Sequence, residues 1–478
     1  MLLAACAADP AGPNLTNATG VPAVPGAFGD EPPPPPPRPR PDHIVVVVEE
    51  NHASGEILGN LVDAAYFNDL ASRGVLFTSS FAIEHPSQPN YLDLFAGGNQ
   101  GVTDDSCPHT FSAPNLAREL ADAGFTFAGY SEGLPAEGAT DCNAGDYWRK
   151  HNPWVNFDNV PASANRTFAA FPADFAQLPT VSFVIPDQQH DMHDGTIRQA
   201  DDWLRANLGA YADWAPAHNS LLIVTFDEDD NSTGNHIFTI AVGAGLAPRH
   251  EPERISHWNV LRTLVDLYGL PPIGTSAKAA AIDVWGDRPT DRHRTVVFVH
   301  ATTSPGQNLL VRGGIDYGYA GAQLSRDCNV DPGGCQVPIA HRNLRDASTA
   351  PLKANDDFLD WLGAEPNQDS AAVGTPADWT IDHWPPAWGP AKTVAVDGYG
   401  EELLNTWGAD EWMLDVDMDC ARTVAGWFEV KSFVQNGSGW EPDVAQAGTP
   451  YATANHMGQC GKLNRFDFGA STVEIHDL

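Results

Sequence analysis

The stretch HIVVVV, residues 43–48, decides the fold class of this 478-residue chain. A continuous apolar run of this kind is typical of a strand that is buried on both faces of a sheet. Further apolar runs lie at 75–82, 125–130, 181–185, 220–226 and 237–243. Patterns with apolar residues three or four positions apart predict helices at 57–74, 113–124, 196–215 and 257–270. Strands alternating with helices predict an α/β domain with a mainly parallel sheet.

Polar side chains follow four of these apolar runs. They are Glu50 and Asn51, His85 and Ser87, Asp191 and His193, and Asp227 and Glu228 with His236. Because ligands bind beyond the carboxyl ends of the strands in such sheets, we expect these residues at one edge of the sheet. One acidic residue after a strand is more often a helix cap, but four polar clusters together are hard to explain by capping.

Crowded carboxylates repel one another unless a cation lies among them. The expected ligands Glu50, Asn51, Asp227 and Glu228 offer oxygen atoms, which suit Mg²⁺, Ca²⁺ or Mn²⁺. The nearby histidines leave Zn²⁺ open as well. The sequence therefore predicts one divalent metal ion without fixing its identity.

Ser87 lies in the polar stretch HPSQPN, residues 85–90, directly before an apolar run. It is either part of a rigid loop stiffened by Pro86 and Pro89 or a nucleophile at the start of a helix. A serine hydroxyl is a poor nucleophile until a base or a metal activates it. A helix N-terminus also favours a phosphate group. With a metal predicted nearby, we favour the nucleophile.

Residues 43–286 resemble the phosphoesterase family of bacterial acid phosphatases and phospholipases C, which has an alkaline-phosphatase-like fold. The resemblance rests on IVVVVEENHAS, HPSQPNYLDLFAGG, FVIPDQQHDMHDG, LLIVTFDEDDN and HWNVLRTLVDLYGLP, in the family's order. It is greatest to short secreted members described as acid phosphatases or phosphatidylinositol-3-phosphatases. It implies a metal held by Glu50, Asn51, Ser87, Asp227 and Glu228, and a phosphoseryl intermediate on Ser87.

The resemblance places five further polar residues near the site: His85, Asp191, His193, His236 and His257. His236 stands where a residue that does not titrate is expected, so it is either an added ligand or a neutral variation. His257 is either functional or a structural hydrogen-bond donor at the start of a helix. We expect Asp229 and Asp230 to be solvated, and Arg149, Lys150 and His151 either bind phosphate or form an exposed basic turn.

The predicted function is a metal-dependent phosphomonoesterase, a hydrolase that acts on phosphoric esters. The start ENHASGEI and the serine hydroxyl favour the phosphatase branch over the phospholipase C branch, which has a different start and a threonine nucleophile. A phospholipase C-type phosphodiesterase, acting on a phospholipid-derived substrate, is the alternative. A cell-surface glycan-binding protein is the second alternative.

The cysteines and the N-terminus predict an extracytoplasmic protein, secreted or lipid-anchored. Residues 3–6 read LAAC and resemble a lipobox, in which Cys6 would be lipidated. Residues 7–42 are rich in proline, so residues 1–42 are expected to be a lipoprotein-like start and a linker. The other six cysteines allow 15 pairings. Proximity favours Cys107–Cys142, Cys328–Cys335 and Cys420–Cys460.

The formal net charge of −36 excludes partners that need clustered cations. Nucleic acid is one such partner and an anionic lipid surface is another. No run of roughly 20 apolar residues is present to span a bilayer. We therefore expect contact with a membrane only through a lipid anchor.

Residues 287–295 are expected to be a linker, followed by a mainly β module with two disulfides at 296–478. This module resembles an accessory module of secreted bacterial α-amylases. Its clustered tryptophans either stack on a glycan or lie in the core. They are Trp379, Trp384, Trp388, Trp407, Trp412, Trp427 and Trp440.

Overall fold

The computed structural model describes residues 40–304, 307–324, 326–342, 357–361, 375–379, 404–408 and 410–478, which belong to one compact unit. The lipidation predicted at Cys6 and nearly all of the linker predicted at 1–42 lie outside these residues. Within the described residues, no helix combines the length and the apolar character needed to cross a membrane.

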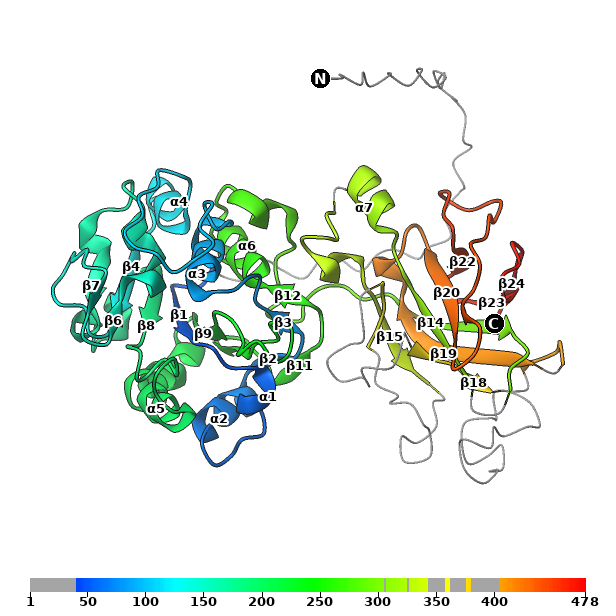
Figure 1. Ribbon diagram of the computed structural model, residues 1–478, viewed down its shortest axis with the longest axis horizontal. Coiled ribbons are helices and arrows are strands. Elements are labelled where there is room, and N and C mark those ends of the chain that lie inside the picture. The colour runs from blue at the N-terminus through cyan, green and yellow to red at the C-terminus, as the bar shows by residue number, and fades with distance from the viewer. Residues whose placement is uncertain are drawn as a thin grey trace, which may run out of the picture. The chain divides into compact units, whose positions relative to one another are not determined.

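An eight-stranded sheet forms the N-terminal half, in the order β11-β2-β10-β9-β1-β8-β4-β7 (Figure 1). Its strands are β1 (His43–Glu49), β2 (Val75–Phe77), β4 (Phe127–Ser131), β7 (Asn165–Thr167), β8 (Val181–Ile185), β9 (Ser220–Phe226), β10 (Thr239–Gly243) and β11 (Arg249–Glu251). β1 lies between β8 and β9 and runs parallel to both. β10 is antiparallel to β9 and β2. The sheet is therefore mainly parallel, with an antiparallel strand towards one edge.

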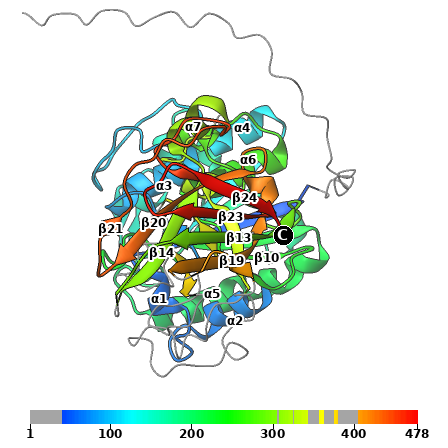
Figure 2. The same cartoon turned by 90° about the vertical axis from the view of Figure 1, so that its right-hand side faces the viewer.

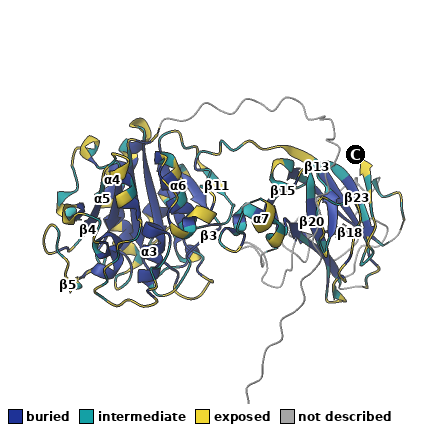
Figure 3. Ribbon diagram, turned by 90° about the horizontal axis from the view of Figure 1, so that it is seen from above, coloured by how far each residue is buried: buried dark blue, intermediate teal, exposed yellow. Residues whose placement is uncertain are grey.

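Helices cover both faces of this sheet because successive residues of β1 point to opposite sides. Ile44, Val46 and Val48 pack into the core shared by α3 (Ser87–Ala96), α4 (Leu116–Asp122) and α6 (His257–Tyr268). Val45 and Val47 pack into the core shared by α2 (Ala65–Arg73) and α5 (Ile197–Trp214). Figure 3 shows the resulting buried centre. The run IVVVV is fully buried, as predicted.

Shorter elements connect this scaffold. The short strands and the one-turn helix are β3 (Ser80–Phe81), β5 (Asn143–Ala144), β6 (Tyr147–Trp148), β12 (Ile255–Ser256) and α1 (Ser54–Ile57). The 3-10 turns are η1 (Arg149–His151), η2 (Pro153–Asn156), η3 (Ala162–Ala164), η4 (Phe168–Ala170), η5 (Phe175–Gln177), η6 (Ala215–Ala217) and η7 (Gly274–Lys278).

Two predicted elements are wrong in extent. The helix expected at 57–74 begins only at Ala65, because Gly59 adopts φ +82° and ends the first turn. The carboxylate of Asp201 accepts hydrogen bonds from the N–H groups of Tyr66 and Phe67, which caps the later start. The strand expected at 75–82 is split into β2 and β3, which pair in different sheets.

The C-terminal part contains two further sheets, seen face-on in Figure 2. One contains β13 (Arg292–His300), β15 (Val337–His341), β16 (Phe358–Leu359), β18 (Asp378–Trp379), β19 (Glu411–Asp419), β23 (Lys462–Asp467) and β24 (Val473–Asp477). The other contains β14 (Asn308–Gly314), β17 (Thr375–Pro376), β20 (Trp427–Gln435), β21 (Gly439–Trp440) and β22 (His456–Gln459). The helical pieces are α7 (Tyr317–Gln323), η8 (Pro332–Cys335) and η12 (Cys420–Arg422). The predicted fold class, a mainly parallel α/β sheet followed by a mainly β region, is confirmed.

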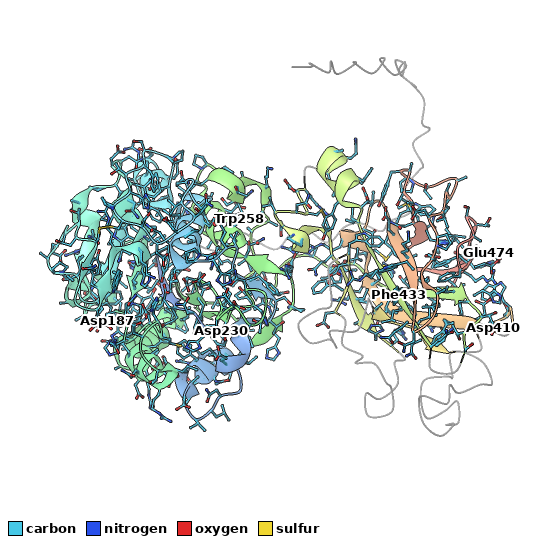
Figure 4. All side chains as sticks on the ribbon, in the orientation of Figure 1. Asp187, Asp230, Trp258, Asp410, Phe433 and Glu474 are labelled. Carbon is cyan, nitrogen blue, oxygen red and sulfur yellow. A yellow bond between two sulfur atoms is a disulfide. The ribbon has the colours of Figure 1, made fainter. Side chains whose placement is uncertain are left out.

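All three predicted cysteine pairs are bonded. Cys107–Cys142 lies in the N-terminal half, and Cys328–Cys335 and Cys420–Cys460 lie in the C-terminal half. The tryptophans of the C-terminal half are in mixed environments. Trp412 is fully buried, while Trp440 is 41% exposed beside Phe433, which Figure 4 labels. Trp384 and Trp388 lie outside the described residues. Sugar binding by this region stays a prediction.

Asp93 on α3 is a buried carboxyl group that couples the fold to pH. It is only 1% exposed, and its Oδ1 atom accepts a hydrogen bond of 3.0 Å from Nε1 of Trp258 on α6 (Figure 4). Burial raises the pKa of Asp93 to about 8, against the Trp258 hydrogen bond, and Glu84 raises it further. Native Asp93 therefore keeps a proton that it loses in the unfolded chain above its ordinary pKa of 3.8.

We predict that Asp93→Asn flattens the pH dependence of stability. The contribution of Asp93 is fully present below about pH 4 and is lost as the pH rises through about 8, because the native state holds the proton more tightly. Asparagine keeps the acceptor for Trp258 but does not titrate. Urea unfolding at a series of pH values should show a steeper fall of the unfolding free energy with rising pH in the wild type. Equal slopes for the two proteins would contradict this assignment.

Candidate active site

Two neighbouring strands bring the central carboxylates together. β1 and β9 are parallel, and Glu49 pairs with Phe226 at their carboxyl ends. The next residues along each strand, Glu50 and Asp227, are 0% and 1% exposed. The backbone N–H of Asp227 donates to the carbonyl oxygen of Glu49 at 2.9 Å. The register of two buried strands therefore fixes the separation of these two acidic residues.

Ser87 lies among these carboxylates at the first residue of α3. Its Oγ atom donates to Oε2 of Glu50 at 3.0 Å and to Oε1 of Glu228 at 3.1 Å, and the residue is 1% exposed. α3 ends at Gly97 with φ +66°, where a Cβ atom would lie 2.2 Å from the carbonyl oxygen of Ile273. Only glycine fits at this position, which brings the C-terminal end of α3 close to the backbone of Ile273.

The carboxyl groups of Glu50, Asp227 and Glu228 hold their protons more tightly than isolated carboxylic acids do. Burial raises the pKa of Glu50 to about 7 and that of Glu228 to about 7. Burial also raises the pKa of Asp227, and the charges of Glu50 and Glu228 raise it further. Three acidic groups in one buried space thus oppose one another's ionisation. That is the electrostatic situation that a bound cation relieves.

The donor set fits a divalent cation. Besides the carboxylates and the Ser87 hydroxyl, Oδ2 of Asp227 is buried and accepts no hydrogen bond within the described part of the chain. Asn51 adopts φ +54°, a conformation that Asn tolerates, and its N–H donates to Oδ1 of Asp227 at 3.3 Å. Hard cations bind oxygen ligands of this kind. The free oxygen of Asp227, the hydroxyl and the two further carboxylates could therefore coordinate one such ion.

A second group of ligand types shares Glu50. Glu50, His151 and Asp191 are all buried, and one ligand atom of each lies within 4.8 Å of the others. Nε2 of His151 is 3.1 Å from Oε1 of Glu50, and Nδ1 is 3.4 Å from Oδ2 of Asp191. The Tyr91 hydroxyl donates to Oε1 of Glu50 at 2.5 Å. One oxygen of Glu50 thus faces Ser87 while the other faces His151 and Tyr91.

Lys150 provides a positive charge next to the acidic cluster. Its Nζ atom donates to Oδ2 of Asp105 at 3.0 Å and to Nε2 of His193 at 3.3 Å, and the residue is 7% exposed. Burial lowers the pKa of Lys150, but the carboxylates of Glu50 and Asp105 raise it by more. The lysine therefore stays charged inside the site.

Asp105 connects Lys150 to the helix that carries Ser87. Its Oδ1 atom accepts the backbone N–H of Gln88 at 3.0 Å, while Oδ2 accepts from Lys150. The disulfide Cys107–Cys142 ties the loop of Asp105 to the segment that leads to Lys150. One carboxylate thus aligns the start of α3 and the lysine together.

Of the predicted histidines, His85 and His193 lie at the cluster. Nδ1 of His85 is 2.6 Å from Oε2 of Glu228, and its Nε2 is 3.4 Å from Oδ1 of Asp229. Nδ1 of His193 contacts Oδ1 of Asp194 at 2.9 Å, which leaves Nε2 on the side of Lys150. The side chains are 32% and 28% exposed, so solvent reaches both.

The structure places His236 and His257 differently. The His236 ring stacks on Phe81, and its Nε2 lies 2.8 Å from the carbonyl oxygen of Thr78. His257 is buried, and its Nε2 lies 2.7 Å from the carbonyl oxygen of Asp227. Burial lowers the pKa of His257 to about 4, so its ring is neutral. His257 supports the backbone behind Asp227, and the His236 contacts in the described chain are those of a structural residue.

One of two alternatives and one expectation about exposure are wrong. Arg149, Lys150 and His151 form no exposed turn: each is less than 10% exposed, and the Arg149 guanidinium donates to the carbonyl oxygens of Thr140 and His109. Asp229 is not solvated either. It is 1% exposed, because its carboxylate accepts three backbone N–H groups in the turn at 231–235.

The sequence did not single out Tyr91 or Asp105. Tyr91 has the helical spacing of a core residue, four positions after Ser87, and nothing in the sequence indicates that its hydroxyl reaches Glu50. Asp105 lies in a loop without a strand before it. The one signal available was the adjacent Cys107, since a disulfide near a predicted site holds its loop in place.

Comparison with known proteins finds relatives that are phosphatases by name. A family model described as "Phosphoesterase family" matches residues 62–271. A curated phosphatidylinositol-3-phosphatase of Mycobacterium tuberculosis is 52% identical over 249 residues, which are 51% of this chain and 83% of that protein. An acid phosphatase of Aspergillus fumigatus is 30% identical over 226 residues, 43% of this chain and 51% of that protein. The chain thus spans about half the length of the fungal relative.

Solved structures are more distant. A protein of the alkaline phosphatase superfamily from Vibrio parahaemolyticus has a TM-score of 0.37 and 13% identity, and the match covers 49% of this chain and 68% of that one. A phosphonate monoester hydrolase of Agrobacterium radiobacter has a TM-score of 0.35 and 14% identity, covering 62% and 85%. Likeness at this level carries no argument about the site.

The 52% identity, over most of the length of the mycobacterial relative, decides the family. This chain belongs to the Phosphoesterase family and is a hydrolase that acts on phosphoric esters.

Proposed function

We propose that this chain is a metal-dependent phosphomonoesterase in which Ser87 is the nucleophile. The observation that carries the proposal is the position of the Ser87 hydroxyl, 3.0 Å from Glu50 and 3.1 Å from Glu228 at the start of α3. The curated relatives are phosphatases by name, which supports a monoester substrate, including the phosphate of a phosphoinositide.

A divalent ion would be held by Glu50, Asp227, Glu228 and the Ser87 hydroxyl, with Asn51 beside them. Bound there, such an ion lowers the pKa of a coordinated hydroxyl and stabilises charge on phosphate oxygens. The carboxylate of Glu228 accepts a hydrogen bond from the Ser87 hydroxyl at 3.1 Å, and we assign to it the role of base for the proton of Ser87. His257 and the β1–β9 register keep Asp227 in place.

The chain's own residues account for both halves of the reaction. Oγ of Ser87 bonds to phosphorus while the bond from phosphorus to the ester oxygen breaks. We assign proton donation to this leaving oxygen to the imidazolium form of His193, in which Nδ1–H stays bonded to Asp194 and Nε2 carries the proton that is transferred. The neutral imidazole then takes a proton from the water molecule that attacks the phosphoseryl group, phosphate leaves, and Ser87 regains its proton from Glu228. Lys150 binds a phosphate oxygen throughout.

Conditions outside the cytoplasm suit the three disulfides, since such bonds persist in oxidising compartments. We propose an extracytoplasmic location on that ground. Lipidation at Cys6 and glycan binding by residues 296–478 stay predictions, as do the boundaries of the linker at 287–295.

We predict that Ser87→Ala reduces turnover of p-nitrophenyl phosphate by about four orders of magnitude, because the covalent route is lost. The matched control is Ser112→Ala, since the Ser112 hydroxyl contacts only Asp158 at an exposed position. Phosphate release should be measured for both variants, and serine phosphorylation should be trapped by acid quenching of the wild type. Turnover by Ser87→Ala near the wild-type rate would refute the proposed nucleophile.

We predict that chelation abolishes activity and that one of Mg²⁺, Ca²⁺, Mn²⁺ or Zn²⁺ restores it. Asp227→Asn should also lower the metal content of the purified protein, because it removes a buried ligand charge. Asp230→Asn is the control, since Asp230 is exposed (Figure 4). Elemental analysis should give one ion per chain, or two if the group of Glu50, His151 and Asp191 also binds. A wild type that is active without metal would contradict the proposal.

We predict that Lys150→Gln lowers kcat/KM for p-nitrophenyl phosphate by about 10- to 100-fold, because a charge-assisted hydrogen bond is lost. The loss should be smaller for bis(p-nitrophenyl) phosphate, whose phosphate carries less charge. Asp105→Asn should have a weaker effect, since it keeps the acceptor for Gln88. Lys462→Gln, which removes only a pair with Asp477, is the control. Equal losses for monoester and diester would argue against the assigned role.

A further inference from the structure

A second charged pocket lies away from the candidate active site. It is a cavity of about 520 Å³, lined by eight residues between positions 253 and 289 and by Arg326, Asp331, Gly334, Ala421 and Arg422. This size is within the usual range of ligand sites. Its cationic residues are Arg262, Lys278, Arg288, Arg326 and Arg422. We call it the arginine pocket.

The composition of the arginine pocket is unusual for this protein. The chain has 26 Lys and Arg residues against 62 Asp and Glu residues, so a random surface would be acidic. Five of those 26 cations line this one cavity, together with only two carboxylates, Glu253 and Asp331. The pocket therefore carries positive charge within a strongly negative protein.

Glu253 is shared by two guanidinium groups. Nη1 of Arg288 is 2.8 Å from Oε2 of Glu253, and Nη2 of Arg422 is 3.0 Å from Oε1. Nη2 of Arg422 also donates to the carbonyl oxygen of Gly333 at 2.7 Å. One carboxylate thus serves two guanidinium groups, and the charges of Asp283 and Glu251 also act on Arg288.

The hydrogen bonds that the Asp331 carboxylate accepts come from neutral groups. Its Oδ1 atom accepts from Nδ2 of Asn259 at 3.1 Å, and its Oδ2 atom accepts the backbone N–H of Ala280 at 2.7 Å. These bonds fix the walls of the pocket. Arg262 and Lys278 have partners of their own, in Asp266 at 2.7 Å and Asp327 at 2.9 Å.

Arg326 is the cation without an acidic partner. Its Nη1 atom donates to the carbonyl oxygen of Gly334 at 3.1 Å, and within the described residues no carboxylate lies within 4.0 Å of its guanidinium. Burial lowers the pKa of Arg326 and the charges of Arg422 and Arg288 lower it further, while the charges of Asp331 and Glu253 act in the opposite direction. The same three guanidinium groups that repel one another could all donate to one ligand.

We propose that the arginine pocket binds a small tetrahedral oxyanion, inorganic phosphate or sulfate, between Arg288, Arg326 and Arg422. Guanidinium groups present paired N–H donors that match the oxygens of such an ion. The bound anion balances the excess charge and joins the segments around Arg288 to those around Arg326 and Arg422. This site is separate from the Ser87 cluster and does not depend on the proposed catalytic function.

The test uses the full chain stripped of metal with a chelator, so that the active site lacks the ion through which it would hold phosphate. Equilibrium dialysis with labelled inorganic phosphate should show one saturable site per chain. Arg326→Gln should weaken this binding by about tenfold or more, which corresponds to one lost charged contact. Arg118→Gln is the control, since the exposed side chain of Arg118 pairs with Asp122 of its own helix. The absence of saturable binding to the wild type, or equal binding by the two variants, would overturn the proposal.

A thermal unfolding series gives a second readout that does not need a folded Arg326 variant. Phosphate and sulfate should each raise the melting temperature of the metal-free wild type, because a ligand of the native state stabilises it. Chloride at the same ionic strength should not. An equal rise of the melting temperature with chloride would show that the effect is general salt screening, and it would overturn the proposal. Ser87→Ala should bind phosphate in the arginine pocket as the wild type does, so a failure of the catalytic proposal would leave this result unchanged.

Discussion

Electrostatic repulsion among buried carboxylates is the constraint on which the rest of the site depends. Glu50 and Asp227 lie side by side because β1 and β9 are parallel and in register, and Glu228 follows directly. The backbone positions that carry them are fixed, since the apolar strands that precede them are packed on both faces. The protein holds these charges in place through the stability of its sheet, and a cation offers the relief.

The residues around this cluster orient Glu50, Ser87 and Lys150. Tyr91 and His151 occupy one oxygen of Glu50, which leaves the other for Ser87. Asp105 fixes the start of α3 and Lys150 together, with a disulfide behind it. The carboxylates alone would repel an anionic ligand. A cation bound among them, together with Lys150, would allow such a ligand to bind. A phosphate ester bound beside a metal has that character.

The arginine pocket follows the same principle with the signs reversed. Like charges are brought together by packing between separate segments, and the local partners do not balance them. The side chains of Arg288 and Arg422 are 32% and 12% exposed, so both are only partly solvated. In both proposals, a bound ion of the opposite sign balances like charges that packing brings together.

The sequence by itself determined the mainly parallel sheet, the positions of its apolar strands along the chain and the strand-end residues Glu50, Asp227 and Glu228, because burial patterns are local. Proximity along the chain favoured the three disulfide pairs among 15 possible pairings. The limits of the helix at 57–74 depended on Asp201, a distant cap, and so could not be predicted. Only the tertiary structure decided that Lys150 and His151 are buried beside Glu50, that Asp229 caps a turn, and that His236 faces Phe81. These outcomes depend on which loops pack together, and contacts between segments far apart in the chain leave no periodic signal in the sequence.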